Sequence, residues 1–227
     1  MARIRQRYLA IIADMVRSRD VAPARRPLLQ RRFADLIVSL NRDYCRTIAA
    51  RFVITLGDEF QGLLHASAII PDLIWRLEQE FPQRELRLGI GLGALDTPLQ
   101  KSAINIDGPA LHAARAAIQA AKQRKVLGGV FRGFGHLDPV LDGIARQLWF
   151  QRARWTASQR MIANLLRQGF SQVKVARKLR IRPQVVSKQA IAAGWPQYLG
   201  AETAWRMILH RQVDPLLESR HGASQRH

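Results

Sequence analysis

The chain has 227 residues, of which 48% are hydrophobic and 23% are charged, as expected for a globular protein with a packed core. No apolar run reaches the roughly 18 residues that a membrane-spanning helix needs, so we expect no membrane protein. The single cysteine, Cys45, cannot form an internal disulfide, and a reducing, cytoplasmic setting is the expectation.

The positive charge is unevenly distributed along the chain. The formal net charge is +19, and residues 1–145 contribute +7 of it while residues 146–227 contribute +12. No carboxylate occurs between Arg146 and Ala201. A long segment of one sign attracts polyanions, so nucleic acid is the leading partner. An Arg-rich solvated surface without a partner is the alternative that charge alone leaves open.

The hydrophobic pattern of the first 145 residues predicts a β-α-β-β-α-β order. The expected elements, in chain order, are a strand at 8–13, a helix at 25–45, a hairpin of strands 51–56 and 60–64, a helix at 66–80, a strand at 86–95 and a helix at 108–125. Residues 126–137 read as a last hairpin or a loop. The predicted fold class is α+β with the ferredoxin-like split arrangement.

This topology places two carboxylates at one end of the sheet. The first and third strands are antiparallel neighbours, Asp14 ends the first, and Asp58 precedes the third at the Gly57-Asp58 turn. Like charges in one place repel unless a proton or cation intervenes, and hard oxygen ligands suit Mg²⁺ or Mn²⁺. We therefore predict a metal site at Asp14 and Asp58. In the alternative, Asp58 is only a turn residue and Asp14 only hydrogen-bonds its own loop.

The loop after the first strand carries Arg17, Ser18 and Arg19. Guanidinium and hydroxyl groups bind phosphate oxygens, so these three residues are predicted to hold a nucleotide. They are equally compatible with plain surface charge.

Four segments resemble the class III nucleotidyl cyclase and GGDEF domain superfamily. They are Asp14 after its strand, the LGDEF sequence of 56–60, the glycine-rich strand 86–93, and the helix start at 108–115. The resemblance implies a nucleotide-binding domain with metal at Asp14 and Asp58, and a catalytic or phosphate-contacting role for Arg115. The whole chain looks most like the SatD family, a bacterial group.

Two departures from the cyclase pattern affect the expected activity. The catalytic Asn of cyclases falls near Leu111 or on His112, and their base-selecting residue falls near Ile54, which cannot hydrogen-bond a purine. We therefore expect nucleotide binding without normal cyclase turnover. The alternatives are an active metal-dependent nucleotidyl-transfer enzyme, or a scaffold for homodimerisation, since cyclase-type domains place their sites at dimer interfaces.

Residues 146–227 are predicted to form a second, helical domain after a first domain of 1–145. Helices are expected at 155–168, 172–180 and 183–193, and the segment 169–181 resembles a helix-turn-helix of the sigma-factor region 4 or LuxR type. The resemblance implies that the last of these helices enters the major groove. Base-reading positions would be Arg182, Gln184, Ser187 and Lys188, and phosphate contacts Lys174, Arg177 and Lys178. A three-helix packing or dimerisation module is the alternative.

These predictions combine into one hypothesis for the whole chain. A cyclase-like domain senses a nucleotide or its metal, and a basic helical domain binds DNA.

Overall fold

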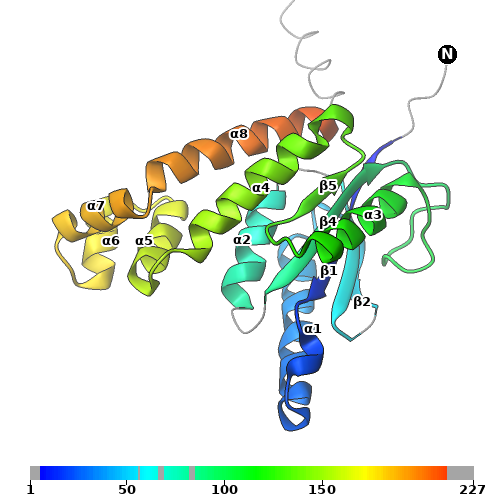
Figure 1. Cartoon of the computed structure of the whole chain (residues 1–227), viewed down its shortest axis with the longest axis horizontal. Helices are drawn as coiled ribbons and strands as arrows, with labels where there is room; N and C mark the ends of the chain where they lie inside the picture. The colour runs from blue at the N-terminus through cyan, green and yellow to red at the C-terminus, as the bar shows by residue number, and fades with distance from the viewer. Residues whose placement is uncertain (1–5, 56, 66–68, 82–84, 214–227) are drawn as a thin grey trace, which may run out of the picture.

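A computed structural model describes residues 6–55, 57–65, 69–81 and 85–213, except for the side chains of Arg19, Gln212 and Val213 (Figure 1). Its sheet strands are β1 (Tyr8–Met15), β2 (Ile48–Ile54), β3 (Glu59–Leu64), β4 (Leu86–Gly93) and β5 (Val130–Arg132). Its α-helices are α1 (Arg26–Asp43), α2 (Ile70–Glu80), α3 (Pro109–Arg124), α4 (Asp138–Ala153), α5 (Ala157–Arg167), α6 (Gln172–Leu179), α7 (Pro183–Ala192) and α8 (Trp195–Val213).

The strands form one sheet in the order β2-β3-β1-β4-β5. β1 is antiparallel to both of its neighbours, β3 and β4, which confirms the predicted β-α-β-β-α-β arrangement of the first four strands. The sequence left residues 126–137 open between a hairpin and a loop. The structure instead shows the short strand β5, which pairs in parallel with the edge of β4.

The continuous apolar run of β1 is explained by burial on both faces of the sheet. Leu9, Ile11 and Met15 belong to a core that includes α1 and α2. Ala10 and Ile12 alternate with them and pack in a second core against α3. Figure 1 shows α3 lying over the sheet in front of α1 and α2.

Glycines in β4 allow α3 to lie against the sheet at backbone distance. A Cβ atom added to Gly91 would clash with the backbone nitrogen of Ala114 and the backbone oxygen of Ala110. The neighbouring positions Gly89 and Gly93 meet the same helix in the same way. Glycine inside a strand is typical of a bulge or of a close backbone approach, and β4 shows the close approach.

Helices α4 to α8 form a helical arm in which α4 and α8 lie against β5 at one end and α5, α6 and α7 lie at the far end (Figure 1). Helices α5, α6 and α7 occupy the predicted ranges to within two residues. The predicted boundary between residues 145 and 146 falls inside α4. The main hydrophobic core runs without interruption from the sheet into these helices. At the junction, the ring of Trp75 lies 5.9 Å from those of both Trp155 and Tyr198. The division into two domains stays a prediction.

A Gly91→Ala substitution tests the packing of α3 on β4. We expect a loss of at least about 2 kcal/mol in the free energy of unfolding, because backbone atoms cannot move aside as a flexible side chain can. Gly143→Ala is the matched control, since a Cβ there meets no atom within 4 Å and α4 gains helix propensity. Urea denaturation measures both variants, and equal stability of the two would contradict the packing.

Candidate functional site

The C-terminal end of β1 and the start of β3 lie side by side, as the topology predicted. The backbone N–H of Met15 donates to the carbonyl of Asp58 at 2.9 Å. In the strand register, Asp14 pairs with Glu59 on one side and with Arg87 on the other. The backbone neighbourhood of Asp14 and Asp58 is therefore present.

The side chains of Asp14 and Asp58 have different surroundings, however. Successive residues of a strand point to opposite faces, so Glu59 shares a face with Asp14 and Asp58 does not. Asp14 contacts Lys122 of α3, whereas Asp58 accepts a hydrogen bond from the Ser18 hydroxyl on the side of α1. The carboxylate that shares a cation with Asp14 is Glu59.

Asp14 and Glu59 form a buried acidic pair, with 8% and 5% of their surface exposed. The Lys122 ammonium lies 3.2 Å from Oδ2 of Asp14 and 3.6 Å from Oε2 of Glu59. Arg87 lies 3.6 Å from the same Asp14 oxygen, and Arg115 donates to Oε1 of Glu59 at 3.1 Å. Two carboxylates and three cations thus form one network, which we call the acidic-pair network.

The burial of Asp14 disfavours the ionised form of its carboxyl group. Burial raises the pKa of its carboxyl group above the ordinary value, and the charges of Lys122 and Arg87 oppose this shift. Its Oδ1 atom is buried without a hydrogen-bond partner among the described residues. The network is therefore compensated in charge but incomplete in hydrogen bonding.

Sequence reasoning missed three members of this network: Glu59, Arg87 and Lys122. The strand register was the missing information, because it decides which residue lies opposite Asp14. Lys122 follows Arg115 by two helical turns, so both lie on one face of α3. This spacing was visible in the sequence.

Asp58 lies at a separate pocket of about 400 Å³. The pocket is lined by Met15, Ser18, Arg26, Leu29, Gln30, Gly57 and Asp58. Of the three predicted nucleotide contacts, Ser18 lines this pocket. Arg17, on the same loop, is exposed and has the left-handed backbone conformation, with φ 52°. The side chain of Arg19 lies outside the described atoms. Nucleotide binding by these residues stays a prediction.

Asp14 and Asp58 have no side-chain partner in common among the described residues, since Asp14 contacts Lys122 and Arg87 and Asp58 contacts Ser18. Within the described residues, no group of three or more His, Cys, Asp or Glu side chains is arranged to hold a metal. Asp14 Oδ1, which is buried and has no partner among the described residues, is an oxygen that a cation would satisfy. The predicted two-Asp metal site is not supported by these surroundings, and the metal itself stays an untested prediction.

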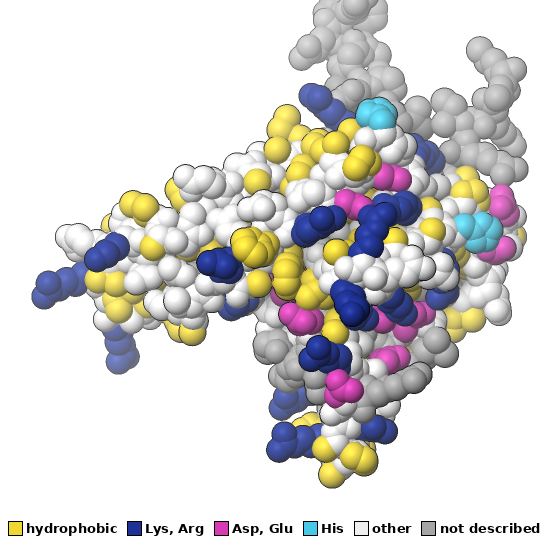
Figure 2. All heavy atoms as spheres, in the orientation of Figure 1, with side chains coloured by type: hydrophobic (Ala, Val, Ile, Leu, Met, Phe, Trp, Pro, Cys, Tyr) yellow, Lys and Arg dark blue, Asp and Glu magenta, His cyan; other side chains and the backbone are white. Residues whose placement is uncertain are grey.

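Helices α6 and α7 carry the predicted DNA contacts on their surfaces. Ser171 caps α6 by accepting from the backbone of Lys174, and Arg180 ends the helix in the left-handed conformation at φ 54°. The three predicted phosphate contacts on α6 are exposed; they are Lys174, Arg177 and Lys178. The predicted base-reading residues Arg182, Gln184 and Lys188 are also exposed, and Ser187 is half-buried. Figure 2 shows Lys and Arg side chains at this end of the molecule.

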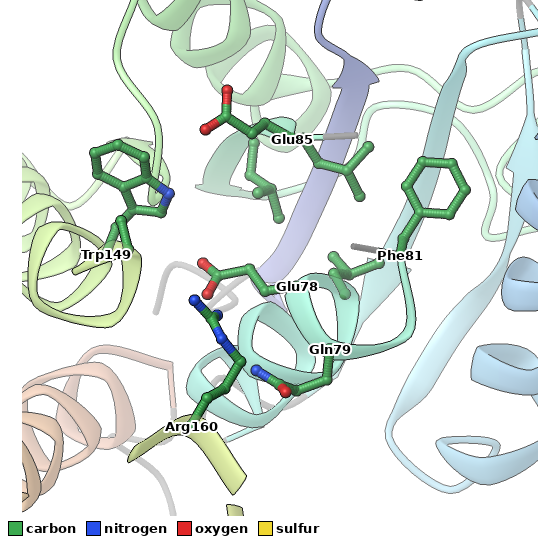
Figure 3. Close-up of a pocket in the computed structure, with 10 residues that line it drawn as sticks. Glu78, Gln79, Phe81, Glu85, Trp149 and Arg160 are labelled. Atoms are coloured by element: carbon green, nitrogen blue, oxygen red, sulfur yellow. The ribbon is translucent and has the colours of Figure 1, made fainter. Parts of the chain in front are cut away.

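A cavity of about 590 Å³, which the sequence did not predict, lies between the sheet and the helical arm. Trp149 of α4 and Phe81 at the end of α2 flank it, and Glu78, Glu85 and Arg160 extend between them (Figure 3). Glu78 is already paired with Arg152 through two contacts of 2.6 Å.

Among the helices that the structure describes, none has the length and apolarity to cross a membrane.

The fold and these sites define an α+β protein in which a five-stranded sheet with a buried acidic pair is joined to short, basic helices. The chain belongs to the SatD family, whose family model matches residues 8–209. No curated protein matches the chain in sequence.

Three solved structures are similar to the chain at low identity. Two are of a bacterial light-regulated adenylyl cyclase, both 13% identical. The match to one has a TM-score of 0.40 and covers 56% of this chain and 43% of the cyclase chain. The match to the other has a TM-score of 0.42 and covers 66% of this chain and 81% of the cyclase chain. The third is the regulator of polyketide synthase expression from Bifidobacterium adolescentis, with 15% identity, a TM-score of 0.27, and coverage of 90% and 84%.

Glu59 and Asp58 are adjacent residues with different expected contributions to stability. Glu59→Gln removes a buried charge that faces Arg115 and Lys122, and we expect a loss of about 1–3 kcal/mol in the free energy of unfolding. Asp58→Asn, at a half-buried position, keeps its ability to accept from Ser18, and we expect a change below about 1 kcal/mol. Urea denaturation at neutral pH compares them, and a larger loss for Asp58→Asn would contradict the assignment.

Proposed function

We propose that this protein is a DNA-binding regulator in which α6 and α7 form a helix-turn-helix. The observation that carries the proposal is the exposed basic surface of these two short helices, inside a stretch of sequence without any carboxylate from Arg146 to Ala201. Such a surface attracts the phosphate backbone of nucleic acid.

In this proposal α7 is the recognition helix and enters the major groove. Pro183 begins the helix. Residues 182–185 are exposed, so the first turn is available to base edges. Arg182, Gln184, Ser187 and Lys188 read bases, and the basic residues of α6 contact phosphates. Val175 and Ala176 of α6 and Val186 and Ala190 of α7 are buried and hold the two helices together.

The α/β part of the proposal is a nucleotide sensor without normal cyclase turnover. Its site is the pocket at Ser18 and Asp58, with Arg17 and Arg19 on the loop beside it. Two contacts argue against turnover at the positions where cyclases act. His112, near the place of the cyclase Asn, lies 2.7 Å from Asp107, and Arg115 is engaged with Glu59 of its own chain.

DNA binding is tested by fluorescence anisotropy with a pool of random duplexes, titrated at several salt concentrations. We expect the affinity to fall steeply with salt, and Lys174→Ala or Lys178→Ala to lower the salt slope by about one. Arg182→Ala and Lys188→Ala should weaken binding severalfold and relax selection of any preferred sequence. Arg124→Ala, an exposed charge at the end of α3, is the control. Unchanged affinity in all α6 and α7 variants would exclude the helix-turn-helix.

Nucleotide sensing is tested by isothermal titration with ATP, GTP and cyclic dinucleotides, each with and without Mn²⁺. We expect binding that Arg17→Ala weakens by about tenfold, the effect of one lost charged contact. Asp58→Ala should weaken it only with Mn²⁺ present, because a carboxylate attracts phosphate only through a cation. Arg51→Ala, an exposed charge on β2, is the control. No binding would remove the sensor, and pyrophosphate release would instead favour the nucleotidyl-transfer enzyme. Mass photometry in the same samples shows whether a homodimer forms without ligand.

A further inference from the structure

The Lys122 ammonium occupies the position that a cation shared by two carboxylates would take. Its nitrogen lies within 3.6 Å of one oxygen of Asp14 and one of Glu59, and both acids are almost fully buried. We propose that Lys122 is a built-in counter-ion that replaces a divalent metal at the Asp14–Glu59 pair, so that the negative charge of this pair is compensated without a metal. The proposal does not rest on the DNA-binding or nucleotide-sensing function.

The charge balance of the acidic-pair network supports this replacement. Asp14 and Glu59 carry two negative charges, and Arg87, Arg115 and Lys122 carry three positive charges at 3.1–3.6 Å from them. A divalent ion added to this group would meet three cations within a few ångströms. Each such repulsion costs about 4 kcal/mol at 4 Å for unit charges near a protein surface, and more for a double charge.

The position of Lys122 follows from backbone packing and does not require a ligand. The β4 glycines let α3 lie directly on the sheet, and Ala110, Ala114 and Ile118 of α3 are buried at that contact. Lys122 is in the last two turns of this helix, above the ends of β1 and β3. Its side chain is 42% exposed, so the stem reaches in from solvent and the ammonium contacts both buried acids.

One observation favours metal binding at the acidic pair and makes the proposal testable. Oδ1 of Asp14 is buried and unpartnered among the described residues, and a metal that displaced Lys122 could bind it. A tethered ammonium and a diffusible ion thus compete for one position. Whether the native chain binds the ion decides between them.

The experiment measures thermal unfolding of the full chain in EDTA, in millimolar Mg²⁺ and in millimolar Mn²⁺. For the native sequence we expect one melting temperature in all three conditions, within about 1 °C. Lys122→Met keeps the length of the stem and removes the charge. It should melt lower in EDTA and regain stability with Mn²⁺, because the uncovered carboxylates then bind the metal. Lys122→Arg should retain the metal-independent behaviour.

The controls separate the site from general effects of charge. Arg124→Met removes an exposed cation two residues away and should show no response to metal. Adding Asp14→Asn to Lys122→Met should abolish the gained response to Mn²⁺. A rise in the melting temperature of the native chain with Mn²⁺ that Asp14→Asn abolishes would overturn the proposal. If Lys122→Met does not fold, this comparison of the native chain with Asp14→Asn still decides it.

Discussion

The register between β1 and β3 is the constraint on which the site depends. Because Asp14 pairs with Glu59, these two acids share the face of the sheet covered by α3, and Asp58 turns to the face covered by α1. A slip of one residue would exchange the two acids and would also move the apolar residues of β1 to the wrong cores. The register is therefore held by Leu9, Ile11 and Met15 on one face and Ala10 and Ile12 on the other.

The close packing of α3 on β4 turns this register into a charge network. With larger residues in place of the glycines, the helix would stand further from the sheet, and Lys122 and Arg115 would lose their reach to the buried acids. Small residues in one strand thus set the position of cations in a helix. The acidic-pair network is a consequence of packing as much as of electrostatics.

The helical arm is attached to the sheet through both apolar and charged contacts. Arg206 of α8 binds Asp72 of α2 at 2.6 and 2.8 Å, and Arg152 of α4 binds Glu78. Such contacts at the base of the arm fix the direction in which α6 and α7 point. In the proposed function, this junction is the route by which ligand binding at the sheet would reach the DNA-binding helices.

The sequence by itself determined the order of the first four strands and the helices between them, and the ranges of α5 to α7 to within two residues, because apolar periodicity and glycine are local signals. It also brought the backbones of Asp14 and Asp58 together, since topology follows from element order. Only the tertiary structure decided that Glu59 and Lys122, and not Asp58, accompany Asp14. The face on which a side chain lies depends on strand register and helix docking, and both are set by packing between residues far apart in the chain.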